Sequence, residues 1–223
     1  MSKVSGSKTA LVIFAREPKL GKVKTRLQCA LPASVVLSLY KEFVKDVLHM
    51  AGKVPCNERF IYYAGKGGSI PFLGKFQNRF RLKRQTGRDL GERMFNAFAR
   101  CRKEGFDRVV IIGTDCLTID AKEIERVFKY LRAYPCVLGP ALDGGYYLIG
   151  LSKLSKRVFT KIDWSSDKVL KQTLGQLKNL GYKSKLISKK DDIDNAASLS
   201  RVITQRPAVL LNKSLAKQIR KFL

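Results

Sequence analysis

The stretch Thr9-Ala-Leu-Val-Ile-Phe-Ala15 is a nearly continuous apolar run, and Arg108-Val-Val-Ile-Ile-Gly113 is a second one further along the chain. A strand with one face in water alternates polar and apolar residues, whereas a strand buried on both faces reads as an unbroken apolar run. Both stretches therefore predict strands in the interior of a sheet.

Strand-like and helix-like segments alternate around these two runs, which predicts an α/β domain over residues 1–205. The other expected strands are residues 59–64, 80–85, 136–139, 146–151 and 184–187. The expected helices are residues 33–51, 90–104, 120–132, 165 or 166 to about 180, and 195–204. A basic tail, residues 206–223, follows the domain and is expected to form a short helix.

The composition removes several classes of protein. No stretch reaches the roughly 18 apolar residues that a membrane-spanning helix needs, and no signal peptide precedes the first strand, so a cytoplasmic protein is expected. The only histidine is His49, and the five cysteines are widely spaced, which excludes histidine-based zinc sites and Ser-His or Cys-His catalysis. Any chemistry must come from carboxylates, cations, backbone amides and a metal ion.

The formal net charge of +26 favours anionic partners such as nucleotides, nucleic acid or anionic lipid surfaces. The lysines and arginines are scattered along the chain rather than gathered in one arm. A solvated basic surface is therefore at least as good an interpretation as a face that binds a polynucleotide.

A cluster of cations directly follows the first expected strand, in the segment from Phe14 to Leu27. Its members are Arg16, Lys19, Lys22, Lys24 and Arg26, around Pro18 and Gly21. Open α/β sheets bind ligands at the carboxyl ends of their strands, and flexible backbone with several cations suits a di- or triphosphate. The glycine spacing is not that of a Walker loop. From composition alone, a solvated basic loop is an equal alternative.

Two acidic positions stand out against the basic background. Asp115 comes just past the apolar strand in Ile-Ile-Gly-Thr-Asp, where packing gives no reason for an acid. A turn or helix cap is the alternative, but Thr118 and Asp120 can already cap the next helix. Since Mg²⁺ prefers one or two carboxylates plus waters and phosphates, Asp115 is predicted to bind metal. The segment Asp191-Asp-Ile-Asp194 is an obvious source of a second carboxylate.

Two glycine-bearing loops are further candidates. Gly139-Pro-Ala-Leu-Asp-Gly-Gly-Tyr146 permits close approach of a ligand to the backbone, although a β-turn explains it as well. Gly87-Arg-Asp-Leu-Gly-Glu-Arg-Met94 places Asp89 before a helix, whose free amides could contact a base or ribose. A capped helix start is the simpler interpretation of this second loop.

Six motifs occur in order along the chain: FAREPKLGKVKTRL, GRDLGERM, IIGTDC, VLGPALDGGYYLIGL, DWSS and DIDN. Together they resemble the glycosyltransferase-A-like transferases that are often encoded beside radical-SAM selenodomain proteins, within the nucleotide-diphospho-sugar transferase superfamily. The resemblance spans about residues 10–200 and implies a three-layer α/β/α sandwich around a mostly parallel mixed sheet. The first loop is also similar to that of 2-phospholactate guanylyltransferase, which handles GTP.

The resemblance implies roles for individual residues. The phosphate-binding group would be Arg16, Lys22, Lys24, Thr25 and Arg26, with Lys24 also taking part in catalysis. The residues against the nucleoside would be Gly87, Asp89 and Arg93. The residues facing the acceptor would be Asp143, Gly144, Gly145 and Trp164. The metal ligands would be Asp115, which would also be catalytic, and Asp194 near the C-terminus.

The sequence departs from the family pattern at two places. Leu117 stands where a proline usually follows Asp-Cys, and Asn195-Ala-Ala-Ser replaces Thr-Pro-Glu-Asp after the last aspartate. The second departure directly follows Asp194.

The sequence thus predicts metal-assisted displacement with Mg²⁺ or Mn²⁺ bridging phosphate oxygens. One version is a glycosyltransferase that uses a sugar nucleotide and releases a nucleoside diphosphate. The other is a nucleotidyltransferase that joins an NTP to a phosphorylated acceptor and releases pyrophosphate. Five cations beside one loop suit a triphosphate, whereas the family label favours the sugar nucleotide. A basic nucleic-acid-binding protein without catalysis is a third and less favoured reading, because the aromatic residues sit mainly in apolar stripes.

Overall fold

The computed structural model describes residues 7–65 and 70–205. Seven strands form one sheet in the order β3-β2-β1-β4-β6-β5-β7. Their bounds are β1 Thr9–Arg16, β2 Glu58–Ala64, β3 Arg81–Arg84, β4 Arg108–Ile112, β5 Cys136–Pro140, β6 Tyr146–Leu151 and β7 Ser184–Leu186. The sheet is mixed and mostly parallel, since only β6 runs against its two neighbours, β4 and β5.

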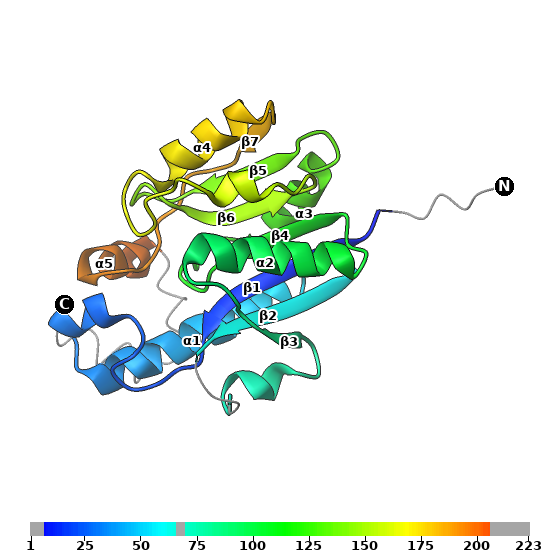
Figure 1. The fold of residues 1–223 in the computed structure, drawn as a ribbon. Coiled ribbons are helices and arrows are strands. Elements are labelled where there is room, and N and C mark those ends of the chain that lie inside the picture. The colour runs from blue at the N-terminus through cyan, green and yellow to red at the C-terminus, as the bar shows by residue number, and fades with distance from the viewer. Residues whose placement is uncertain (1–6, 66–69, 206–223) are drawn as a thin grey trace.

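Five α-helices cover the two faces of the sheet (Figure 1), with bounds α1 Ala33–Ala51, α2 Leu90–Lys103, α3 Ala121–Tyr130, α4 Val169–Asn179 and α5 Ala196–Gln205. Helices α1, α3 and α5 contribute to one hydrophobic core, and α2 and α4 to the other. Short 3-10 turns complete the fold, with bounds η1 Thr25–Cys29, η2 Leu73–Phe76 and η3 Lys156–Phe159. The expected three-layer α/β/α sandwich is confirmed.

The central strands show why their sequences are continuously apolar. Along β1, Leu11 and Ile13 belong to the core under α1, whereas Ala10 and Val12 belong to the core under α2. Successive side chains of a strand point to opposite faces, so a strand with a helix layer on each side needs apolar residues at every position. All five residues of β4 are likewise buried.

The sequence predicts a helix that begins at Ser165 or Ser166, but α4 begins at Val169 and has no side-chain cap. Ser165 instead has a positive φ of 70°, and the Ser166 hydroxyl donates to Asp163 O, so both serines belong to a turn. The basic tail, residues 206–223, lies outside the described residues. In the described ranges no helix is both long and apolar enough to cross a membrane.

Candidate functional site

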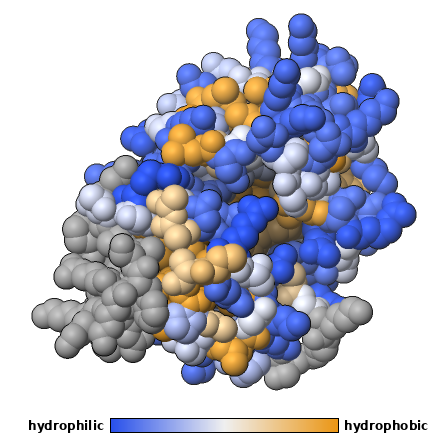
Figure 2. Space-filling model, turned by 90° about the vertical axis from the view of Figure 1, so that its left-hand side faces the viewer, coloured by the Kyte–Doolittle hydropathy of each residue, from blue (hydrophilic) through white to orange (hydrophobic). Residues whose placement is uncertain are grey.

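A cavity of about 710 Å³ opens at the carboxyl ends of β1, β2 and β4, and Figure 2 shows the hollow from that side. Parallel strands end at the same edge of a sheet, so the loops that follow β1 and β4 meet here. Of the predicted site residues, those that line the cavity are Arg16, Lys22, Lys24, Thr25, Arg26, Arg93, Asp115, Asp143, Gly145, Trp164 and Asp194. The topology thus gathers residues from six separate segments.

Three predicted residues lie outside the cavity lining. Asp89 caps α2 by accepting a hydrogen bond from Glu92 N at 2.8 Å, so its carboxylate is engaged in the helix start. Gly87 has a φ of 136° in the preceding loop, where its carbonyl accepts from Arg93 Nε at 3.2 Å. Gly144 has a φ of 88° in the turn between β5 and β6 and packs against the Asp167 backbone.

Lys24 is the most constrained residue of the basic loop. Its backbone is left-handed (φ 45°, ψ 47°), although it is not a glycine, and its side chain is only 5% exposed. The Nζ atom lies 2.8 Å from Asp115 Oδ2 and 3.4 Å from Asp194 Oδ1. Burial disfavours the charged form and is the largest influence, but these carboxylates outweigh it and raise the pKa of Lys24. Lys24 is therefore a buried ammonium held between two acids.

The segment after β7 is fastened to the Asp115 loop through the backbone. Ile193 N donates to Asp115 O at 3.0 Å, and the Ile193 side chain is fully buried. The Ser198 hydroxyl accepts from Asp194 N at 2.9 Å, while Arg26 Nη1 lies 2.7 Å from Asp194 Oδ2. These contacts fix the Asp194 carboxylate beside Asp115 even though the sequence after it departs from the family pattern.

Asp192 is a site residue that the sequence reasoning did not single out. Its Oδ1 atom is buried and accepts no hydrogen bond from any described residue. Burial, followed by the charges of Asp115 and Asp143, raises the pKa of Asp192 to about 7, and Lys24 opposes the shift. In an extended segment residues i and i+2 share a side, so the buried Ile193 between two acids was a usable signal. Asp191 by contrast pairs with Arg201 at 2.6 Å.

The donor set fits a hard divalent cation. In the described ranges no three acidic, cysteine or histidine side chains form a ready-made metal site. However, Asp115 and Asp194 already converge on a cation, the Lys24 ammonium, and Asp192 adds a buried oxygen without a partner. Mg²⁺ and Mn²⁺ need only one or two protein carboxylates when water and phosphate supply the other ligands. Asp115 and Asp194, with Asp192 behind them, could hold such an ion.

Part of the cavity lining is apolar. It includes Phe14, Ala64, Leu90 and Met94, and Gln85, the residue directly after β3, also lines the cavity. Leu90 is 44% exposed, which is unusual for a large apolar side chain at the start of a helix that packs on the sheet. The sequence analysis placed the nucleoside against residues 87–93 but gave no role to Gln85.

Trp164 lies on the side predicted for the acceptor. Its ring packs on the backbone of α2 at Gly91, where an added Cβ would lie 2.5–2.7 Å from ring atoms. Asp143 stabilises the neighbouring turn by accepting from Gly145 N at 2.9 Å. The tight contact between the Trp164 ring and the backbone of α2 explains why residue 91, in the first turn of the helix, is a glycine.

Replacing Gly91 by alanine is expected to push the Trp164 ring away from α2 and to destabilise the protein by about 1–3 kcal/mol, as overpacking does. Trp164 is the only tryptophan, so intrinsic fluorescence reports on it alone, and a red shift of emission is expected. Gly175→Ala in α4 is the matched control, because nothing lies within 4 Å of its added Cβ. An unshifted spectrum for Gly91→Ala would contradict this packing.

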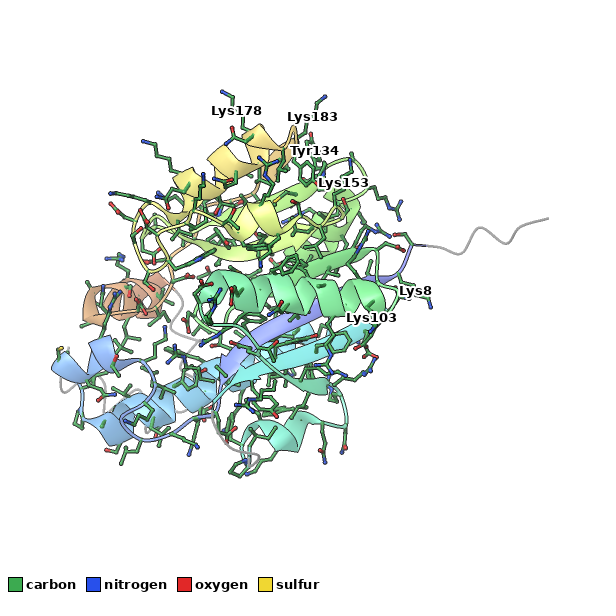
Figure 3. The ribbon with its side chains drawn as sticks, viewed as in Figure 1. Lys8, Lys103, Tyr134, Lys153, Lys178 and Lys183 are labelled. Carbon is green, nitrogen blue, oxygen red and sulfur yellow. The ribbon has the colours of Figure 1, made fainter. Side chains whose placement is uncertain are left out.

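The high positive charge is not concentrated at the cavity. Lys8, Lys103, Lys153, Lys178 and Lys183 point outward at separate places on the rim of the molecule (Figure 3), and all five are exposed. The charge is therefore distributed over the surface, in agreement with the scattered cations of the sequence.

Solved structures share this fold. A crystal structure from Desulfovibrio desulfuricans G20, whose assignment as a nucleotide-diphospho-sugar transferase is itself provisional, is 28% identical, with a TM-score of 0.84 over 96% of this chain and 95% of that one. CMP:2-keto-3-deoxy-manno-octonic acid synthetase complexed with CTP is 12% identical, with a TM-score of 0.54 over 90% and 99%. Rv0371C of Mycobacterium tuberculosis H37Rv, in complex with manganese, is 13% identical, with a TM-score of 0.54 over 89% and 99%. The last two show likeness of fold alone.

Sequence comparison gives the family. No curated protein sequence matches the chain. Residues 47–166, more than half of the chain, match DUF2064, which is described as an uncharacterized protein conserved in bacteria. The chain therefore belongs to the DUF2064 family.

Proposed function

We propose that this protein is a transferase that binds a nucleotide-activated donor together with Mg²⁺ or Mn²⁺. One observation carries the proposal: Asp115 and Asp194, from segments 79 positions apart in the chain, converge on a single cation, Lys24 Nζ, inside the large cavity. Two structurally similar proteins support the same class of reaction. One is provisionally assigned as a nucleotide-diphospho-sugar transferase, and the other is a synthetase complexed with CTP.

The cations around the cavity would hold the phosphates of the donor. Arg16 ends β1, Lys22 lies in the loop that follows, Arg26 lies in η1, and Arg93 comes from α2. Tyr40 holds the start of this loop, because its hydroxyl accepts from Arg16 N at 3.0 Å. Arginine and lysine side chains around a polyphosphate position it and stabilise its charge. These two effects supply most of the catalysis of phosphoryl-type transfer.

The acid cluster would hold the metal ion, through Asp115 and Asp194 and with Asp192 as the additional oxygen. A divalent ion at this place would neutralise charge on the phosphates of the donor. With an ion bound there, the Lys24 ammonium would no longer lie between the two acids and would instead be available to the phosphates of the donor. The manganese in Rv0371C agrees with a divalent ion in this fold.

The glycosyl and nucleotidyl versions share this machinery and differ in what leaves. A sugar-nucleotide donor would release a nucleoside diphosphate, whereas an NTP would release pyrophosphate. The side of the cavity with Asp143, Gly145 and Trp164 would receive the acceptor in both versions. Product analysis for pyrophosphate against nucleoside diphosphate separates the two.

The proposal is tested by isothermal titration of NTPs and sugar nucleotides, each with Mn²⁺ and with EDTA. Binding that requires Mn²⁺ and weakens about 100-fold or more in Asp115→Asn is expected, since loss of a ligand exceeds the 10–100-fold cost of losing an outer-shell partner. Asp191→Asn is the control, because that carboxylate pairs with Arg201 outside the cluster.

Failure of every nucleotide to bind would refute the proposal. Tight, salt-sensitive binding of a polynucleotide that Asp115→Asn leaves unchanged would favour the nucleic-acid-binding alternative instead.

A further inference from the structure

The lining of the large cavity divides by charge along the sheet. Its cations are Arg16, Lys22, Lys24, Arg26 and Arg93. Four of them come from the end of β1 and the segment that follows it, and Arg93 comes from α2, which follows β3. Arg93 Nε donates to Gly87 O at 3.2 Å, so its guanidinium is held against the loop between β3 and α2. We call these five cations the donor half of the lining.

A second group of lining residues comes from the other side of β4 in the sheet. We call it the acceptor half, and its members are Asp143, Gly145, Tyr146, Trp164, Ser165, Ser166 and Asp167. The first three follow β5, which is the third strand from β1 in the order β1-β4-β6-β5. Three strand spacings amount to about 14 Å. Figure 1 shows the segment after β1 in blue and the segment before α4 in yellow at opposite ends of this edge of the sheet.

The two segments of the acceptor half are fastened to each other. Leu170 N donates to Gly144 O at 2.9 Å, and the Asp167 backbone lies so close to Gly144 that an added Cβ would be 2.1–2.6 Å from it. Gln172 in α4 holds the second segment, because its Oε1 accepts from Asp163 N and its Nε2 donates to Asp163 Oδ2, both at 2.7 Å. The acceptor half is therefore one continuous wall of the cavity.

This wall carries two carboxylates and no cation. Asp143 Oδ1 accepts from Gly145 N at 2.9 Å, but within residues 7–65 and 70–205 neither Asp143 nor Asp167 forms an ion pair. Lys168, the next residue in the chain, is exposed and does not line the cavity. The chain has 44 Lys and Arg against 18 Asp and Glu. A wall with acids alone therefore runs against the composition of the protein.

The division by charge bears on the acceptor of the proposed reaction. The phosphates of the donor would lie among the cations of the donor half, so the acceptor has to approach from the acceptor half. Carboxylates accept hydrogen bonds from hydroxyl and amino groups, whereas they repel a phosphate. The Trp164 ring adds a flat apolar face, which suits the apolar side of a ring or an ammonium group.

We propose that the acceptor of this transferase reacts through a hydroxyl or amino group and carries no phosphate beside it. The oxygen or nitrogen of that group would form the new bond to the transferred group. The bond between the transferred group and the departing phosphate oxygen would break with its electron pair, and the proton of the acceptor would pass to water. This inference rests on the proposed function, and it removes the phosphorylated acceptor from the nucleotidyl version.

The charge of the acceptor half can be measured through Trp164, the only tryptophan. Collisional quenching of its fluorescence by caesium and by iodide is compared at equal ionic strength, with N-acetyltryptophanamide as the reference. Relative to the reference, caesium is expected to quench at least about threefold better than iodide, because a wall of one sign concentrates its counter-ions. A second cavity of about 270 Å³, which Trp164 also lines, holds three acids and two lysines and so does not favour iodide.

Replacing both Asp143 and Asp167 by asparagine is expected to abolish the preference for caesium and to make iodide the better quencher, since the net charge is +26. Asparagine retains an acceptor for Gly145 N, so the turn is kept. Glu42→Gln combined with Glu125→Gln is the control. It also removes two negative charges, but from ion pairs on α1 and α3, which pack on the other core from Trp164, and should leave the preference unchanged.

Acceptors are then compared in matched pairs, glycerol with glycerol 3-phosphate and glucosamine with glucosamine 6-phosphate, each with Mn²⁺ and the nucleotides that bind. Faster transfer to an unphosphorylated member would support the inference. Faster transfer to a phosphorylated member would overturn it.

The outcomes separate this inference from the proposed function. Nucleotides that bind with Mn²⁺, while iodide quenches Trp164 at least as well as caesium, would overturn the inference about the acceptor and leave the proposed function standing. Failure of every nucleotide to bind would overturn the proposed function, and this inference with it, whatever the quenching shows.

Discussion

Replacing Lys24 by methionine is expected to destabilise the metal-free protein by about 2 kcal/mol and to make its stability depend on added Mn²⁺. The ammonium is the cation that compensates Asp115 and Asp194, at 2.8 and 3.4 Å. Breaking a fully buried pair costs about 3–5 kcal/mol, but these carboxylates are 40% and 38% exposed, so water screens part of the repulsion that is left.

The measurement is urea unfolding in EDTA and in millimolar Mn²⁺, followed by circular dichroism. Mn²⁺ should raise the free energy of unfolding of the variant by at least the amount that the substitution removes. The ion takes the place of the lost ammonium, and it no longer competes with Lys24 for the two carboxylates. Arg26→Met is the control: its side chain is 67% exposed, so its ion pair with Asp194 should contribute about 0–1 kcal/mol. If Lys24→Met has the same free energy of unfolding as the wild type in EDTA, and added Mn²⁺ does not change it, the acids are not a cation site.

Asp192→Asn is expected to act in the opposite direction. The folded protein holds a proton on Asp192 up to a pKa of about 7, whereas the unfolded chain releases it near pH 4. The folded state therefore binds more protons between these values, and the wild type loses stability as the pH rises from about 4 to about 7. The loss is at most about 4 kcal/mol, and asparagine, which does not titrate, escapes it.

In EDTA the variant should match the wild type at pH 4 and exceed it by about 2–4 kcal/mol at pH 8. Mn²⁺ at pH 8 should reverse the order, because only the wild type has the buried carboxylate oxygen to offer. Asp191→Asn, in the same segment but paired with Arg201, should show neither change. A difference between Asp192→Asn and the wild type that does not vary with pH would disprove this account.

The two variants together test one physical idea, that the acid cluster is short of positive charge. Lys24 and the exposed Arg26 supply two cations for the carboxylates of Asp115, Asp192 and Asp194. Once Asp192 is ionised, removing the buried ammonium and removing one acid should therefore have opposite effects. A cluster that served only to anchor the loop after β1 would lose stability in both cases.

The strands of the sheet could be predicted from the sequence because their burial is symmetric. Residues 10–15 and 109–112 are apolar at every position, as a strand with a helix layer on each face requires. The start of α4 could not be predicted in the same way. Ser165 and Ser166 are residues typical of a helix cap, but Ser165 has a positive φ of 70° and the Ser166 hydroxyl donates to Asp163 O, so both lie in a turn before the helix.

The sequence shows which acidic residues could bind a metal ion, but it does not show how far apart their carboxylates lie. Asp115 is conspicuous because it directly follows an apolar strand, and Asp194 because it belongs to an acidic segment in a basic chain, whereas no sequence feature distinguishes Asp191 from Asp192. Backbone pairing of Ile193 with Asp115 O turns Asp192 into the cluster, and Asp191 turns out to Arg201. The catalytic and binding roles of all these residues stay predictions.

The sequence by itself determined the α/β architecture, since this follows from residue type and periodicity, and it predicts which loops carry a ligand. Only the tertiary structure decided that Lys24 lies between Asp115 and Asp194, and that the Gln85 amide is held by carbonyls of β1 and β2. Such contacts join segments far apart in the chain. They form because the sheet brings the ends of several strands to one edge, and no local pattern of residues encodes which side chains then meet.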